Sequence, residues 1–413
     1  MAESQNLAKN TLLQVNDLTY VFPKNLSVVE RRVLIRSNFA KSSYDSTEVA
    51  NCELNSGDYL IGGKNSYFYG KLTVTSAGGT GTWDVSNWGL ASLIASIAIK
   101  APSGEELERV DNPGHIRAIE DRYRHGADWF TSNGSLSRYG ATGTSAQVVD
   151  FCIPMGALLG CFRTDALLPS QGWAGAQIEI RFNTVALAFK TLTLADLSYT
   201  ITNPSIVCDC YTPTPGIKAQ LNTMSASRGL EVYFDSFDHS QAKSTGAGSL
   251  SMQARKTMGR AMYVVVQSRN DSNLLGTAGT DPTISSPQTV DATSGAVTAG
   301  IGSYLFNLGG LFFPNQPVNT NTEMVQNALY VYGKHQEEAH PGSVGLTEFG
   351  TNAIACASLE RSSLLALSGL PVGTGRILNL DITLVGATPR THDMFVNYVK
   401  VARCYLNRVK VIE

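Results

Sequence analysis

Charged side chains are scarce in this sequence. Lys, Arg, Asp and Glu together make up 16% of the 413 residues, whereas soluble globular domains average about 25%. A monomer stays soluble through a charged surface, and the buried cores of protein interfaces are depleted in charge. The composition therefore favours a subunit that buries much of its surface in an assembly.

A net positive charge is also lacking. The 32 basic and 34 acidic residues leave a net charge of −2, so the chain as a whole does not attract phosphates. Residues 1–20, which we interpret as an N-terminal arm, contain Lys9 as their single cation beside Glu3 and Asp17. We therefore expect no direct nucleic-acid binding.

Targeting and membrane signals are missing from the sequence as read. The longest apolar stretch, 90–99, has ten residues, about half of a membrane span. The first residues lack the charged and apolar regions of a signal peptide, and Ala2 stands where N-myristoylation requires glycine. The seven cysteines are odd in number and scattered, which favours reduced thiols. We expect synthesis in the cytosol.

Enzyme motifs are missing as well. No Gly-x-Ser-x-Gly string marks a hydrolase elbow, and no P-loop occurs. The glycines at 78, 79 and 81 lack the spacing of a dinucleotide site and predict a flexible hairpin. His335 and His340 are five residues apart, so a helix would not place both on one face as a metal site requires. A solvated helix end and loop explains them better.

The cysteines and the sequons have a simple structural interpretation. Cys208 and Cys210 are too closely spaced for a zinc knuckle, and Cys152 with Cys161 has no second pair nearby. We interpret these thiols as core residues. Glycosylation sequons begin at Asn25, Asn133 and Asn270. Because sequons matter only in a secreted protein and no signal peptide is found, we interpret them as chance matches.

An acidic cluster could suggest glycoside hydrolysis, which uses paired carboxylates. The cluster consists of Glu105, Glu106, Glu108 and Asp111. Sugar sites also need aromatic platforms, and the chain has only four tryptophans, Trp83, Trp88, Trp129 and Trp173. We predict instead that 102–111 is a turn and strand that exposes these acids and points Leu107 and Val110 inward. The sequence thus predicts no enzyme and no catalytic, cofactor-binding or metal site.

Most of the chain has the pattern of β-strands. Short runs alternate apolar and polar side chains, and Gly, Ser, Thr and Asn separate them about every ten residues. Such runs are typical of sandwich or barrel strands with one inward face. The clearest runs are 32–36, 69–74, 97–99, 148–155, 230–234 and 263–266.

Two segments have the helical period instead. Asn112-Pro113 provides a cap and an N1 proline before an apolar face that begins at Ile116. Thr322-Glu323 provides a hydroxyl cap and an acidic first turn before Val325. Each predicts a short helix inserted between strands.

An internal repeat indicates two copies of one domain. Leu168-Pro169 is followed by a polar loop and the alternating strand 178–182, and Leu370-Pro371 by an equivalent loop and the strand 380–384. The copies lie 202 residues apart, which is close to half the chain. A chance match remains an alternative, because Leu-Pro before a strand is common in all-β proteins.

A domain boundary is expected near the middle of the chain, where a duplicated domain would require it. The prolines in 211–216 disfavour helix and interrupt ladder hydrogen bonds, so 213–215 reads as a linker between domains 21–212 and 216–413. Residues 270–302 are rich in Gly, Ser, Thr and Ala. We predict a long exposed loop of the second domain there, because such a stretch cannot build a core.

Several of these segments resemble one family, the double jelly-roll major capsid proteins. The run 90–99 followed by Ser103-Gly104-Glu105-Glu106-Leu107-Glu108-Arg109-Val110-Asp111 is similar to a strand, turn and strand that lead into an inserted helix, here 112–131. The segments 151–160 and 167–169 are similar to the family's Ile-Pro-Leu and Leu-Pro-Leu region, and 312–317 to its second barrel. The chain is shorter than many members and lacks a clear large tower insertion in its first half.

The resemblance is to the adenovirus, tailless-phage and virophage lineage, most of all to polinton-like viruses and virophages. It implies an all-β fold of two tandem eight-stranded jelly-roll barrels with short inserted helices. It also implies a homotrimer with pseudo-hexagonal outline in an icosahedral DNA virus shell. The implied partners are neighbouring capsomers, penton and minor capsid proteins and an internal lipid membrane, and the implied location is the virion.

Two other functions fit an all-β chain of this kind. A β-sandwich carbohydrate-binding module or polysaccharide lyase would share the architecture, because sandwiches and jelly rolls host many functions. A minor capsid or spike subunit is the second alternative. A stable trimer in solution would favour the major capsid protein over the carbohydrate-binding alternative.

Overall fold

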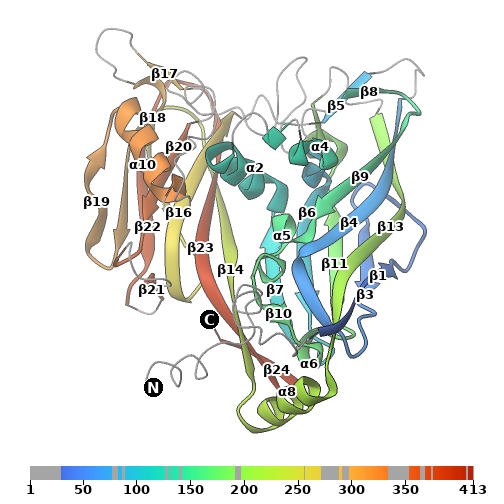
Figure 1. Cartoon of the computed structure of the whole chain (residues 1–413). Helices are drawn as coiled ribbons and strands as arrows, with labels where there is room; N and C mark the ends of the chain where they lie inside the picture. The colour runs from blue at the N-terminus through green and yellow to red at the C-terminus, as the bar shows by residue number, and fades with distance from the viewer. Residues whose placement is uncertain are drawn as a thin grey trace.

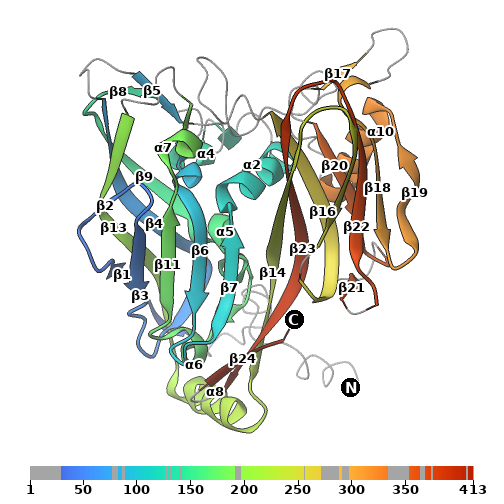
Figure 2. The ribbon, with the colours of Figure 1, turned by 180° about the vertical axis from the view of Figure 1, so that it is seen from behind.

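The computed structural model describes residues 29–76, 82–85, 89–125, 129–130, 132–138, 142–190, 197–254, 256–270, 288–290, 297–333, 353–362, 368–373, 375–405 and 408–412. The predicted N-terminal arm, the glycines at 78, 79 and 81 and the segment 335–340 lie outside these ranges. The described part is a β-protein in which two groups of sheets stand side by side (Figures 1 and 2).

The first group of strands forms two main sheets. One has the order β1-β13-β4-β10, with β2 pairing with β13 and β9 with β4, and the other has the order β3-β11-β6-β7. A small sheet, β12-β5-β8, lies at one end. The bounds are β1 (Val29–Asn38), β2 (Ser43–Asp45), β3 (Val49–Glu53), β4 (Leu60–Ser76), β5 (Thr82–Val85), β6 (Ile94–Lys100), β7 (Glu106–Asp111), β8 (Thr142–Thr144), β9 (Val148–Pro154), β10 (Leu167–Leu168), β11 (Gln177–Phe182), β12 (Phe189–Lys190) and β13 (Leu197–Pro213).

The second group also forms two sheets. One has the order β14-β23-β16-β20, with β21 pairing with β16 and β24 with β23; the other has the order β15-β22-β18-β17, with β19 pairing with β18. The bounds are β14 (Leu230–Ser244), β15 (Gly248–Gln253), β16 (Met258–Asn270), β17 (Thr289–Val290), β18 (Val297–Leu308), β19 (Leu311–Val318), β20 (Ile354–Ser358), β21 (Leu370–Val372), β22 (Leu378–Val385), β23 (Arg390–Tyr405) and β24 (Arg408–Ile412).

Both groups follow the jelly-roll topology. Eight strands of each group, numbered along the chain, pair in the order 1-8-3-6 in one sheet and 2-7-4-5 in the other. In the first barrel they are β1, β3, β4, β6, β7, β10, β11 and β13, and in the second β14, β15, β16, β18, β19, β21, β22 and β23. Two Greek keys of this kind make a jelly roll. The prediction of two tandem eight-stranded barrels is confirmed.

The internal repeat found in the sequence falls on equivalent strands. Leu168 ends β10 and Leu370 begins β21, and each of these is the sixth strand of its barrel. Ile178 in β11 and Leu380 in β22 then lie in the seventh strands, and each pairs with both the second and the fourth strand. The match is therefore structural, not a chance recurrence of Leu-Pro.

Both predicted helices are present, and they too are equivalent. Helix α2 (Pro113–Arg124) follows the fifth strand of the first barrel, and α10 (Asn321–Gly333) follows the fifth strand of the second. Proline is the first residue of α2, where a missing N–H costs nothing. The shorter helices are η1 (Gly89–Leu93), α4 (Asn133–Leu136), α5 (Met155–Leu158), η2 (Gly160–Phe162), α6 (Ser170–Trp173) and α7 (Val185–Ala188).

Two predicted irregular segments are partly regular. The segment predicted as the linker 213–215 is shared between two elements, because Pro213 ends β13 and Pro215 begins α8 (Pro215–Ser227). Proline disfavours a helix interior but suits its first position, so the prediction that these prolines prevent a helix was wrong. Most of the predicted loop 270–302 lies outside the described residues, but 297–302 belong to β18 and Thr289–Val290 form β17.

Candidate functional site

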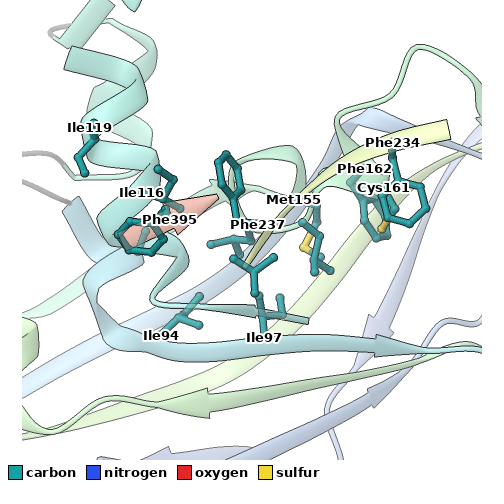
Figure 3. Packing of buried hydrophobic residues seen from close by; sticks show 14 of the residues in the cluster. Ile94, Ile97, Ile116, Ile119, Met155, Cys161, Phe162, Phe234, Phe237 and Phe395 are labelled. Atoms are coloured by element: carbon teal, nitrogen blue, oxygen red, sulfur yellow. The ribbon is translucent and has the colours of Figure 1, made fainter. Parts of the chain in front are cut away.

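The two barrels meet along an interface of apolar side chains, which we call the seam. From the first barrel, Ile116 and Ile119 of α2, Met155 of α5 and Phe162 of η2 are buried. Figure 3 shows them beside Phe234 and Phe237 of β14 and Phe395 of β23, which come from the second barrel. Each fully buried side chain of this size stabilises the packing by about 1.5–3 kcal/mol. The seam is therefore a shared core and not a mobile contact between domains.

Backbone contact across the seam is close. A Cβ atom built at Gly160 would overlap the carbonyl oxygen of Asp235 in β14, and one built at Gly172 would lie 2.5 Å from Sγ of Cys404 in β23. Lys400 of β23 is buried, and its Nζ donates to the Leu107 carbonyl of β7 at 3.2 Å. Glycine at 160 and 172 allows the barrels to approach at these positions.

A buried acid in β23 organises the first polar cluster of the seam. One carboxylate oxygen of Asp393 lies 2.9 Å from His239 Nε2 and accepts from Gln241 Nε2 at 2.8 Å, both in β14. The other accepts from Arg269 Nε of β16 at 2.5 Å. We call these four residues the Asp393 cluster. Asp393 is fully buried and Arg269 is 6% exposed, so the cluster is an ion pair removed from water.

Helix α2 covers this cluster from the first barrel. His115 Nδ1 lies 3.9 Å from the carboxylate of Asp393, Nε2 contacts the amide oxygen of Gln267, and its ring meets Phe395 edge-on at 5.1 Å. Burial lowers the pKa of His115 to about 3, so the ring is neutral. Burial alone would raise the pKa of Asp393, but Arg269 and His239 outweigh it and hold the carboxyl ionised.

A second buried acid, Glu120 of α2, forms a neighbouring cluster. Its carboxylate lies 3.1 Å from a guanidinium nitrogen of Arg124 and 3.1 Å from one of Arg163, and it accepts from Tyr263 Oη of β16 at 2.9 Å. Burial raises the pKa of Glu120, yet Arg124, Arg163 and Arg117 lower it to about 2. The cluster thus ties α2 and the loop after η2 to the second barrel.

Glu108 corrects one sequence-based prediction. We expected all four acids of the 105–111 cluster to face solvent, but Glu108 is fully buried. Its two carboxylate oxygens accept the backbone N–H groups of Gly160 and Cys161, each at 2.9 Å. Burial raises the pKa of Glu108, while these two N–H groups act in the opposite direction. The acid holds η2 in position beside the seam.

A break in strand register explains why the prediction failed. The pairing of β6 with β7 shifts between Ile99↔Glu108 and Lys100↔Glu106, which leaves Leu107 as a bulged residue. A bulge places two consecutive side chains on the same side of a strand. Leu107 and Glu108 are both buried, and Val110 is buried as predicted.

The other residues weighed in the sequence lie apart from the seam clusters or are structural. Cys208, Cys210 and Cys161 are buried core thiols, as predicted, and Cys152 is half-buried. Trp83 and Trp173 are buried and thus form no exposed platform, while Trp129 stacks on His125 at 4.3 Å. Of the sequon asparagines, Asn133 lies in α4 and Asn270 ends β16, and Asn25 is outside the described residues.

The described residues also line two surface hollows, one of which reaches Gln241 of the Asp393 cluster. A groove of about 800 Å³ beside β14 and β15 is lined mainly by small or uncharged polar residues such as Ser240, Gln241 and Ser251. A hollow of about 200 Å³ near α8 carries the Lys218 and Asp58 ion pair. Within the described ranges, no group of three His, Cys, Asp or Glu residues is arranged to hold a metal ion. Likewise, none of the helices described there is long and apolar enough to cross a membrane.

Sequence reasoning missed the residues of both seam clusters. The partners of Asp393 lie 124 to 154 positions away along the chain, and Tyr263 lies 143 from Glu120. No spacing pattern links residues so far apart. The available signal was weak, namely charged residues inside runs that otherwise read as buried strand or helix.

Comparison with solved structures identifies the fold of this chain. No family model matches the sequence, and no curated protein matches it. PBCV-1 VP54, as fitted into a cryo-EM reconstruction of the virophage Sputnik, has a TM-score of 0.66 at 10% identity over 96% of this chain and 99% of its own. The Faustovirus major capsid protein has 0.64 at 8% identity, over 97% and 96%. A chain of the Sputnik virophage solved by cryo-EM has 0.62 at 10%, over 98% and 91%. The chain therefore has the double jelly-roll fold along nearly its whole length.

Proposed function

We propose that this chain is the major capsid protein of an icosahedral DNA virus. The observation that carries the proposal is the double jelly roll, in which one chain supplies two equivalent barrels fused along a buried seam. The similarity to the Faustovirus major capsid protein covers 97% of this chain and 96% of that one. Low overall charge supports extensive burial between subunits.

In this proposal the chain acts as a structural subunit of the shell. Three copies form a pseudo-hexagonal capsomer of six barrels, and capsomers tile the faces of the shell in the virion. The chain divides into an arm at 1–20 and barrel units at 21–212 and 216–413, joined through 213–215. Neighbouring capsomers, penton and minor capsid proteins and an internal lipid membrane are its partners. It does not bind the genome directly, in keeping with its net charge of −2.

The seam explains how the chain would act as one rigid block. Fused domains usually move relative to one another unless their interface is large and apolar. Here the interface combines buried aromatic side chains with two ion-paired clusters. A rigid pair of barrels presents a fixed outline, which a closed shell requires of its repeated unit.

Light scattering on the purified chain tests the proposal. We expect three chain masses at micromolar concentration, and electron micrographs of hexagonal particles about 75 Å across, as six barrels of roughly 200 residues would form. A monomer that retains a polysaccharide on a column would instead support the carbohydrate-binding alternative. A low copy number in purified virions would indicate a minor capsid or spike subunit.

A further inference from the structure

The second barrel has an open side between its first two strands. Strand β14 lies at the edge of one sheet and β15 at the edge of the other, and among the described strands each pairs with a single neighbour, β23 or β22. The groove of about 800 Å³ lies between them, and we call it the β14–β15 groove. The unpaired edge of a strand offers a row of N–H and C=O groups to an added strand.

The residues that line the groove show that it follows the edges of both strands. They include the consecutive residues 240–242 of β14 and 251–253 of β15. Consecutive side chains of a strand point to opposite faces of its sheet, so both faces border a hollow only where the hollow runs along the edge. The groove therefore has the position that an extended peptide takes when it adds a strand to a sheet.

The same side of the first barrel is closed. Its first two strands, β1 and β3, are the equivalents of β14 and β15. The Ala40 N–H, just after β1, donates to the Asn51 carbonyl of β3 at 3.0 Å, and the Asn55 N–H donates to Ser37 Oγ of β1, also at 3.0 Å. In the described part of the second barrel, no backbone hydrogen bond joins β14 to β15. The two barrels thus differ in whether this side can receive a further strand.

A buried hydroxyl in the groove lacks a partner. Ser240 is 5% exposed, and its Oγ makes no hydrogen bond within the described residues, although buried polar groups are normally hydrogen-bonded. A main chain in the groove would bring N–H and C=O groups that can bond to it. The small residues Ala242, Ala254 and Gly373 also line the groove and leave room for a backbone to approach.

We propose that the N-terminal arm of the chain lies in its own β14–β15 groove as an added strand. The described chain begins at Val29, and the 28 residues before it span up to about 95 Å when extended. Val29 pairs with Pro213, and Pro215 begins α8, which leads directly into β14. Figures 1 and 2 show α8 at one end of the molecule, with β14 extending away from it. The arm therefore starts close to the strand that borders the groove.

The sequence of the arm suits the lining of the groove. Apolar side chains recur through 12–20, namely Leu12, Leu13, Val15, Leu18 and Tyr20. The groove offers them Met252, Val372 and Ile377, and Ile377 is 50% exposed without an occupant. Asp17 is the one charged residue of 12–20. Its sign is opposite to that of Lys256, the one charged side chain among the described residues that line the groove.

Hydrogen exchange on the full-length chain tests whether the groove is occupied. A double variant, Leu13→Lys and Leu18→Lys, places charges in the arm and changes no described residue. We expect exchange at alternate amides of β15 to become about tenfold faster than in wild type, because their partner strand is lost. The amides of β3 in the first barrel should keep their rates. Ser4→Lys with Asn6→Lys, which adds the same charge outside 12–20, is the matched control. Unchanged exchange in β15 of the Leu13 and Leu18 variant would overturn the inference.

Paired cysteines test whether the arm occupies the groove of its own chain. Ser251→Cys, at an exposed position of β15, is combined in turn with Val15→Cys, Asp17→Cys and Thr19→Cys, and the full-length variants are oxidised. We expect at least one pair to form a disulfide within one chain, identified as a linked peptide from a single-chain band on a non-reducing gel.

The same arm cysteines combined with Leu136→Cys on α4, where the side chain is 58% exposed, are the control. Yields no higher than the control would overturn the inference. Disulfides that link two chains would also overturn it, because the arm would then belong to another copy. Neither result changes the number of chains in the particle, so the proposed function is tested separately by light scattering.

Discussion

Asp209 in the first barrel and Asp393 in the second are both buried acids of an eighth strand, but their arginine partners lie in different surroundings. In each barrel the eighth strand carries an acid that binds an arginine and a side-chain amide from flanking strands. Asp393 and Arg269 are removed from water beneath α2, whereas Arg32 is largely in solvent. Exposed ion pairs contribute about 0–1 kcal/mol, and a buried pair makes each partner indispensable to the other.

Substitution of Asp393 and of Asp209 should give the largest difference in the free energy of unfolding. We expect Asp393→Ala to lower the free energy of unfolding by about 3–5 kcal/mol, because it leaves Arg269 charged, buried and unpaired. Asp209→Ala should cost less, about 1–2 kcal/mol, because Arg32 can be hydrated and only the Asn65 amide and the Tyr211 hydroxyl lose a buried acceptor. Urea titration of both variants measures the difference. Equal losses of unfolding free energy would show that burial of the arginine partner does not change what the acid contributes to stability.

Substitution at Gly160 tests how closely the two barrels pack across the seam. Gly160→Ala should lower the free energy of unfolding by about 3 kcal/mol, because its methyl group would overlap the backbone oxygen of Asp235 across the seam. Gly216→Ala in α8 is the control, because nothing lies within 4 Å of a Cβ there. A tolerated Gly160→Ala would mean that the barrels can separate without cost.

We expect low pH to lower the free energy of unfolding through His115, which lies at the seam. The folded pKa of His115, about 3, lies below the unfolded value of about 6.5. Below pH ~6.5 the unfolded chain therefore binds a proton that the folded chain does not, and stability falls by up to about 1.4 kcal/mol per pH unit. Between pH 7 and 5 the loss should be about 2 kcal/mol.

The groups around His115 determine how far this effect extends. Asp393 of β23, Arg269 of β16 and His239 of β14 face it. The pKa of Asp393 is lowered, so its own contribution is lost only below pH ~4. Unfolding measured at both pH values in His115→Gln should show a smaller loss than in wild type. An unchanged loss would assign the acid sensitivity to other groups.

The smallest expected effect concerns two neighbouring acids of β7. Glu108→Gln should cost about 1 kcal/mol, because an amide oxygen replaces only part of the carboxylate that accepts the Gly160 and Cys161 N–H groups. Glu106→Gln, whose side chain is 42% exposed, should be neutral. Thermal unfolding of both variants compares them, and equal melting temperatures would mean that Glu108 does not stabilise the seam.

Local patterns in the sequence predicted the elements of the fold well. The period-two runs lie in strands, except that Met155 at the end of 148–155 begins α5, and Asn112 immediately precedes α2. The predicted cap Thr322 was wrong, because α10 begins at Asn321 and Thr320 accepts the Glu323 N–H. The repeat 202 residues apart identified the sixth and seventh strands of both barrels. These features depend on neighbouring residues and on burial of one face, which a single sequence records directly.

The predictions failed where contact between distant segments decides the outcome. Glu108 reads as one of several solvated acids, and a bulge turns it inward. Pro215 reads as a helix breaker, and its place at the start of α8 makes it compatible with helix. In both cases the residue type is unchanged and the position within the element decides its role.

What the sequence by itself determined was the class of the protein: strands of period two, two inserted helices, a duplicated domain and a low content of charged residues. Only the tertiary structure decided which faces are covered. Asp209 and Asp393 both read as acids inside strands, and both are buried, but the arginine that pairs with Asp393 is 6% exposed and the one that pairs with Asp209 is 59% exposed. Burial depends on the whole arrangement of the barrels, since it is set by surfaces that meet across more than a hundred residues of chain.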